Sequence, residues 1–217
     1  MPSGRRGDDV ATEFTRMLQQ LKRRGCNLLL VGSVPDSVLS CASRKFFGDP
    51  HERRFRVVVL TGTSRTTVDE RVPMYGTHEE RTTVITHLTE PADCEVPSDH
   101  VDSSVPELSN AVSSSITSFE TDDGLQSGQL RVGVDSLESL FERYDPEAVQ
   151  RFLGIVTGRI RGADGMGHFI FPRDYDHDLV SELAPLFDGV VEYRIDGEGQ
   201  ERWHFPHRDL QSPWLPL

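Results

Sequence analysis

Apolar positions recur at two different periods along the chain and divide it into alternating helices and strands. Residues 10–24 carry apolar side chains at helical spacing, end in three basic residues and precede a glycine, which predicts an amphipathic helix. The run over 27–32 is almost continuously apolar and ends in glycine, as is typical of a parallel strand covered on both faces. A helix over 35–46 and a strand rich in β-branched residues over 55–61 are expected next.

The second half of the chain repeats this alternation and ends in a hairpin. The sequence Asp-Gly-Glu-Gly over 196–199 predicts a tight connection between the last two strands. The pattern favours an α/β fold with a mostly parallel sheet, helices on both faces and a C-terminal antiparallel hairpin. The expected strands are 82–86, 130–135, 167–171, 190–195 and 201–205, and the expected helices are 105–119, 145–160 and 177–186.

The length favours one domain over residues 1–217. We expect residues 1–8 to form a flexible start, and the segment 88–105, rich in Pro, Asp and Ser, to form a surface loop. The tail over 207–217 ends in Trp-Leu-Pro-Leu. This apolar end either docks onto its own sheet, which we prefer, or marks a contact surface for a partner. The polar stretch over 62–81 predicts no element.

Composition narrows the classes of partner. The formal net charge is -12, and only Lys22 and Lys45 among the 23 basic residues are lysines. This balance is typical of proteins from salt-loving archaea, where salt screens the self-repulsion, although an acidic protein from a GC-rich genome is an alternative. An acidic surface repels nucleic-acid phosphate and anionic lipid, so neither is an expected partner. No apolar run has the length of a membrane span and the start lacks a signal-peptide pattern, so a cytoplasmic location is expected.

Candidate metal and hydrolase motifs are incomplete. The three cysteines form no C-x-x-C pair, which argues against a disulfide framework or a zinc site. Asp174, Asp176 and Asp178 resemble a calcium loop but lack its glycine and final glutamate, so we interpret them as caps of the next helix. His168 opens an apolar strand and is interpreted as a core or edge histidine, and the G-x-S-x-G pattern is absent. No metal or cofactor is therefore expected.

The first predicted strand ends at Gly32, where the phosphate loop G-x-x-x-x-G-K-[ST] of an ATPase would begin. Ser37 stands at the second glycine, Val38 replaces the lysine and Leu39 replaces the magnesium-binding hydroxyl. Without lysine, nothing in this loop neutralises the β and γ phosphates. The loop also opposes phosphate, because Asp36 adds a negative charge beside it.

The strand over 130–135 ends in Asp135 and has the form of a Walker B strand. In an ATPase this carboxylate holds the magnesium shell, but a strand can equally end in aspartate as a turn or cap residue. Together with the loop, this strand end defines the vestigial nucleotide-site positions that we predict. They are Gly32, Ser33, Asp36, Ser37, Asp135 and Ser136.

The chain resembles the KaiC-like branch of the RecA superfamily and, more narrowly, an uncharacterised family of halophilic archaea that keeps this fold without the phosphate loop. The resemblance implies a RecA-like fold and a regulatory or signalling role. KaiC-like ATPases also carry acidic residues after the second strand that activate water, whereas this chain has Thr-Gly-Thr-Ser over 61–64. The residues that carry the resemblance are 23–32, 132–137, 151–153, 165–169, 203–205 and 214–217.

We therefore expect a non-catalytic RecA-like module that acts through an unknown protein partner or through self-association. The missing lysine and hydroxyl of the loop carry this expectation. The alternative is an atypical nucleotide-binding protein or ATPase that uses Asp135 with the degenerate phosphate loop. A ring or scaffold subunit is a third interpretation, because RecA-like domains often form rings.

Overall fold

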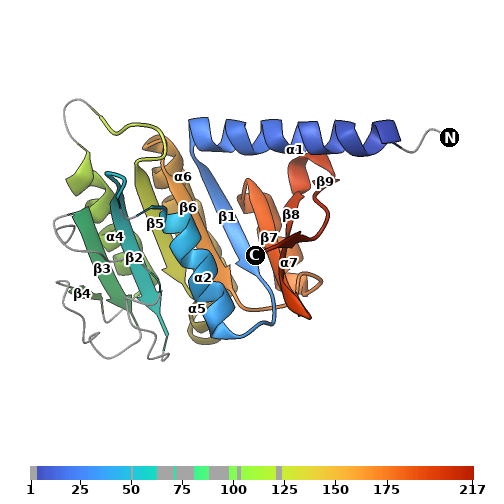
Figure 1. Cartoon of the computed structure of the whole chain (residues 1–217). Coiled ribbons are helices and arrows are strands. Elements are labelled where there is room, and N and C mark those ends of the chain that lie inside the picture. Colours follow the sequence, from blue (N-terminus) through green and yellow to red (C-terminus); the bar gives the residue numbers. More distant parts are fainter. Residues whose placement is uncertain are drawn as a thin grey trace.

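A single ten-stranded sheet organises the molecule (Figure 1). The computed structural model describes residues 4–49, 51–62, 71, 81–87, 98–101, 104–120 and 124–217. The strands are β1 (Cys26–Val31), β2 (Phe55–Thr61), β3 (Thr82–His87), β4 (Ser98–Val101), β5 (Leu130–Asp135), β6 (Met166–Phe171), β7 (Gly189–Asp196), β8 (Glu198–Phe205), β9 (Leu210–Gln211) and β10 (Leu215–Pro216).

The strand order is β10-β8-β7-β1-β6-β5-β2-β3-β4, with β9 paired to β8. All strands from β7 to β4 in this order run parallel, whereas β8, β9 and β10 pair antiparallel at one edge. The predicted α/β class, with a mostly parallel sheet and a C-terminal antiparallel hairpin, is confirmed. The hairpin turn is tighter than expected, because Asp196 already pairs with Glu198 across Gly197.

Helices cover both faces of the sheet because side chains alternate across each buried strand. Leu28 and Leu30 of β1 pack under the first two helices, whereas Leu29 and Val31 pack against the later helices. Figure 1 shows this division, with the helix that follows β1 in front of the sheet, the helices drawn in green and orange behind it, and the first helix running across the upper strand ends. The front layer is α1 (Gly4–Arg24) and α2 (Asp36–Phe47), and the back layer is α4 (Val105–Phe119), α5 (Leu137–Arg143), α6 (Pro146–Gly162) and α7 (Asp178–Leu183), with 3₁₀ turns at Ala184–Leu186 and Pro206–Arg208.

Several segments differ from the sequence-based expectations. Residues 4–8, expected as part of a flexible start, belong to α1. The segment expected as a loop over 88–105 contains β4, while 88–97 and 102–103 lie outside the described residues. The tail lies on its own sheet, where Leu215 pairs with Glu201. Helix α5 was not predicted, because only seven residues give too short a periodic pattern.

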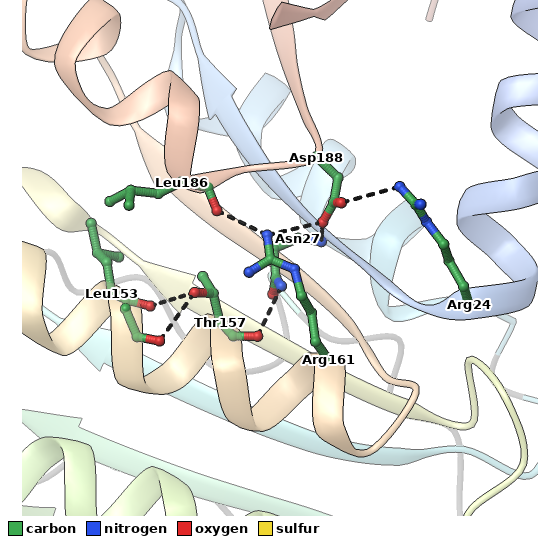
Figure 2. A network of polar contacts seen from close by, with 8 residues as sticks. Arg24, Asn27, Leu153, Thr157, Arg161, Leu186 and Asp188 are labelled. Atoms are coloured by element: carbon green, nitrogen blue, oxygen red, sulfur yellow. Dashed lines mark hydrogen bonds and ion pairs between the residues drawn. The ribbon is translucent and has the colours of Figure 1, made fainter. Parts of the chain in front are cut away.

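Strand β1 is buried along its whole length, so its one polar side chain needs internal partners. The Asn27 side chain donates to the Thr157 carbonyl at 3.1 Å, and its backbone N–H donates to Asp188 Oδ2 at 2.9 Å. Asp188 also pairs with Arg24 at 3.4 Å and with Arg161 at 3.3 Å. Figure 2 shows the two arginines approaching Asp188 from α1 and α6. The network therefore ties the end of α1, the start of β1, α6 and the entry to β7 together.

None of the helices in the described ranges combines the length and the apolar character that crossing a membrane requires.

Replacing Asp188 with alanine should lower the free energy of unfolding by about 1–3 kcal/mol, because the buried Asn27 N–H loses its carboxylate acceptor. Loss of the ion pairs with Arg24 and Arg161 should lower the free energy of unfolding only slightly more, since both arginines are exposed. Denaturant unfolding in molar KCl measures the change. Glu182→Ala, an exposed acidic position on α7, is the matched control and should stay close to wild type. Equal stabilities for the two variants would refute the assigned role of Asp188.

Candidate functional site

The candidate site is a hollow at the carboxyl ends of the parallel strands, where ligands bind in open α/β sheets. Its volume is about 270 Å³, and its walls come from the start of α2, the ends of β2 and β5, and α5. Asp36, Asp135 and Ser136, three of the predicted positions, line it together. Asp36 is about 100 residues away from Asp135 and Ser136 in the sequence, and it meets them because the parallel strands β1 and β5 end on the same side of the sheet.

A buried arginine that the sequence analysis did not identify lies between the two aspartates. Arg71 Nη2 donates to Asp36 Oδ1 at 2.6 Å, and Arg71 Nε lies 2.6 Å from Asp135 Oδ2. The second contact is a close ion pair without hydrogen-bond alignment. The Arg71 side chain is only 3% exposed. Its guanidinium thus joins the first turn of α2 to the end of β5.

The electrostatics of the hollow centre on Asp135, whose side chain is 15% exposed. Burial raises the pKa of Asp135 to about 6; the Arg71 guanidinium opposes this rise, while the Asp36 charge adds to it. Glu138 and Glu142 add further carboxylates to the same walls. Glu138 also forms an ion pair with Arg173. The hollow therefore carries more negative than positive groups, even with Arg71 in place.

The loop after β1 is closed by apolar packing at the positions where a phosphate loop would present lysine and a hydroxyl. Leu39 is buried in the front-layer core, and Val38 packs against the same cluster. The Val38 N–H donates to the Pro35 carbonyl at 2.9 Å. Both side chains therefore turn toward the protein interior, and one amide of the first turn is already used within the loop.

Gly32 is required by the approach of β7. Its φ is 144°, and a Cβ atom at this position would lie 2.4 Å from the Tyr193 carbonyl oxygen. The Gly32 N–H donates to the Arg173 carbonyl at 2.8 Å. This glycine lines a second hollow of about 380 Å³, on the β7 side of the loop. That hollow contains the carboxylates of Asp174, Asp176 and Glu192.

Two of the predicted positions lie apart from this arrangement. Ser33 and Ser37 are exposed and line neither hollow. Ser136 lines the first hollow, the Thr61 hydroxyl donates a hydrogen bond to its carbonyl, and its peptide bond to Asp135 is cis. Gly62 follows Thr61, and a Cβ atom there would lie 2.6 Å from Ser139 Oγ. The chain just after β2, where KaiC-like ATPases carry water-activating acids, thus packs against α5 at Gly62, while residues 63 and 64 lie outside the described ranges.

Some site residues that the sequence analysis did not identify had a recognisable pattern around them, and others had none. Arg71 lies in a polar stretch without periodicity, so nothing local distinguished it from its neighbours. Helix α5, which supplies Glu138 and Glu142, did carry a weak signal, since Leu137 and Leu140 follow Ser136 at helical spacing.

The other candidate residues, His168 and the aspartates over 174–178, do not form a metal site among the described residues. His168 is a core histidine, as predicted: its Nε2 lies 2.9 Å from Ser43 Oγ, and burial lowers its pKa to about 3. The predicted capping by the aspartate triplet is wrong, because His177 Nδ1 caps α7 by accepting from the Leu179 N–H. Within the ranges that the structure describes, no three His, Cys, Asp or Glu side chains are grouped so as to hold a metal ion.

Comparisons with known proteins identify a family and a fold. Residues 25–193 match the model of a family described as a family of unknown function, DUF7504. No curated protein matches the chain. A similar solved structure is the crystal structure of the uncharacterized protein PH0321 from Pyrococcus horikoshii in complex with an unknown peptide. The two chains are 14% identical with a TM-score of 0.58, and the match covers 90% of this chain and 89% of the other, which shows a shared fold.

Replacing Asp135 with asparagine should make stability less dependent on pH. Folding raises the pKa of Asp135 from 3.8 to about 6, so its contribution to stability is complete below about pH 4 and is lost as the pH rises through 6. The asparagine variant has no such loss. Its stability advantage over wild type should grow from near zero at pH 4 to about 3 kcal/mol above pH 6.

Denaturant unfolding at fixed KCl concentration across this pH range measures the difference. The exposed variant Glu182→Gln is the control and should follow the wild-type curve. A difference between Asp135→Asn and wild type that stays constant from pH 4 to pH 7 would contradict the raised pKa.

Proposed function

We propose that this chain, which belongs to the family of unknown function DUF7504, is a non-catalytic RecA-like or KaiC-like module that acts by binding a protein or peptide. Its role is regulatory or signalling. The observation that carries the proposal is the Asp36–Arg71–Asp135 bridge at the edge where a nucleotide would bind. The other interpretation, an atypical nucleotide-binding protein or ATPase that uses Asp135, is the opposing outcome of the test below.

The bridge supports loss of nucleotide binding because it satisfies Asp135 within the protein. In an ATPase, this carboxylate would hold the magnesium shell. Here it faces a buried guanidinium at 2.6 Å, and a magnesium ion would have to displace that cation or approach it closely. Like charges about 4 Å apart repel by about 1 kcal/mol in water and several times more in a partly buried site. The bridge thus disfavours the metal as well as replacing it.

The size and charge of the hollow support the same conclusion. Its volume of about 270 Å³ lies below the range of about 300–1,000 Å³ typical of ligand pockets. The carboxylates of Asp36, Glu138 and Glu142 line it, and the hollow beside Gly32 is also acidic. A triphosphate would therefore meet negative charge on both sides of the loop.

Binding of a protein or peptide is supported by the fold and by an exposed apolar patch. The similar protein from Pyrococcus horikoshii was solved with an unknown peptide. On this chain, Ile195 and Leu217 are 52% and 50% exposed and lie on either side of Gly199. A Cβ atom at Gly199 would lie 2.6 Å from Leu217 Cδ1, so the glycine lets the tail lie flat beside the hairpin. We propose this hairpin patch, Ile195 with Leu217, as the contact surface.

Thermal unfolding in molar KCl should be unchanged by millimolar ATP and magnesium. A ligand at 100 times its dissociation constant would stabilise the protein by about 2.7 kcal/mol, which is a clear upward shift of Tm. A conventional phosphate-loop ATPase in the same buffer is the positive control. An upward shift for this chain, or phosphate release that is lost in Asp135→Ala but kept in Glu182→Ala, would overturn the non-catalytic assignment.

Selection from a random peptide library displayed on phage, in molar KCl, should enrich peptides that bind wild-type protein. Ile195→Asp should weaken the selected peptides at least about tenfold, because it puts a charge at the centre of the apolar patch. Ile155→Asp is the matched control, since Ile155 is 44% exposed on α6.

Light scattering tests whether the patch mediates self-association: an oligomer that Ile195→Asp dissociates supports this form of the proposal. No enriched peptide and a strict monomer together would contradict the patch.

A further inference from the structure

A third pocket lies at the opposite ends of the strands from the candidate site. It has a volume of about 350 Å³, and its lining includes residues of α1, the helix that crosses the amino ends of the strands in Figure 1. Its walls are mainly apolar: Phe14 and Leu18 of α1, Phe46 of α2, Met166 of β6 and Trp203 of β8. The volume and the apolar character fall within the range of small-molecule sites.

Arg131 gives this apolar pocket a buried positive charge. It lines the pocket and is only 9% exposed. Its Nη1 donates to the Phe46 carbonyl at 3.2 Å, and its Nε is buried without an acceptor. Among the described residues, no carboxylate forms an ion pair with it. A buried guanidinium without a counter-ion is costly, so it points to a missing anion.

The charged residues around Arg131 leave its positive charge uncompensated. Arg54 also lines the pocket, and its one carboxylate partner is Glu52, on the exposed side. Burial, and after it the Arg54 charge, lower the pKa of Arg131 to about 10. Lys45 and Glu201 pair with each other at 2.9 Å and cancel. The pocket is therefore left with one positive charge in excess, at Arg131.

The end of α2 offsets this charge only in part. The last turn of α2 supplies the Phe46 carbonyl, and a helix C-terminus carries roughly half a negative charge. Arg56 lies beside Arg131 in register on β2 and is buried as well, with its own bond to the Asp49 carbonyl. Arg131 thus donates to a carbonyl in the last turn of α2, and Arg56 donates to a carbonyl just after this helix. Neither guanidinium forms an ion pair with a carboxylate among the described residues, so the positive charge remains.

We propose that this pocket binds a small ligand with an apolar body and a single carboxylate. The apolar body packs among Phe14, Leu18, Phe46 and Trp203, and the carboxylate pairs with the guanidinium of Arg131. A single carboxylate matches Arg131, which is the one cation of the pocket lining without a carboxylate partner among the described residues, whereas Arg56 does not line the pocket. The planar fork of arginine suits a carboxylate in particular. The site is independent of the proposed function, because it lies at the other edge of the sheet.

The test uses the full chain in molar KCl and isothermal titration with octanoate, with octanol as the uncharged counterpart. Octanoate should bind at millimolar concentration or tighter, and octanol should bind at least about tenfold more weakly. Arg131→Met should weaken octanoate at least about tenfold, while Arg151→Met, an exposed position on α6, should leave it unchanged.

A second variant keeps the test decisive if Arg131→Met does not fold. Leu18→Trp fills the pocket from the half-buried side of α1 and should abolish octanoate binding with Arg131 intact. Failure of octanoate to bind wild type, or equal binding of octanoate and octanol, would overturn the proposal. Unchanged affinity in a folded Arg131→Met protein or in Leu18→Trp would overturn it too.

The same chemistry exists in free acids and at the C-terminus of a peptide that ends in an apolar residue. An acetylated Gly-Ser-Leu-Phe peptide with a free carboxylate, compared with its C-terminal amide, distinguishes these sources. Tighter binding of the peptide acid than of octanoate, with no binding of the amide, identifies a peptide terminus. Binding of octanoate alone identifies a free acid.

Discussion

The complete burial of β1 is the constraint on which the rest of the molecule depends. The strand lies between β6 and β7 and under helices on both faces, so each backbone and side-chain polar group along it needs an internal partner. The backbone N–H of Asn27 donates to Asp188 and its side-chain nitrogen donates to Thr157, which ties the entry to β7 and α6 to this strand. At the other end, Gly32 passes so close to β7 that no side chain fits. Strand β1 thus constrains the packing at both its amino and its carboxyl end.

The two candidate sites are opposite in charge balance and share their scaffold. At the carboxyl edge, Arg71 meets two aspartates and the remaining charge is negative. At the amino edge, Arg131 meets no carboxylate among the described residues and the remaining charge is positive. Strand β5 carries Arg131 near its start and Asp135 at its end, and α2 runs from one site to the other. The sheet thus connects two pockets of opposite charge balance.

The fold and the function rest on different kinds of evidence. A chain that is 14% identical adopts the same architecture over nine-tenths of its length, so the fold tolerates wide change in sequence. Function depends on a few side chains at the strand ends, and one fold can host many unrelated functions. Three residues of this chain, Arg71, Arg131 and the exposed Ile195, each present a charge or an apolar surface that the fold alone does not require.

Most strands and helices follow from the amino-acid pattern, because buried parallel strands appear as apolar runs and helices as a period of 3.6 residues. The pattern also identifies Asp135 at a strand end and the apolar residues that replace the phosphate-loop lysine and hydroxyl. The strand order, the contact of Arg71 with Asp36 and Asp135, and the isolation of Arg131 are visible only in the folded chain. These pairings join residues far apart in the chain, and an ion pair leaves no periodic pattern in the residues on either side of it.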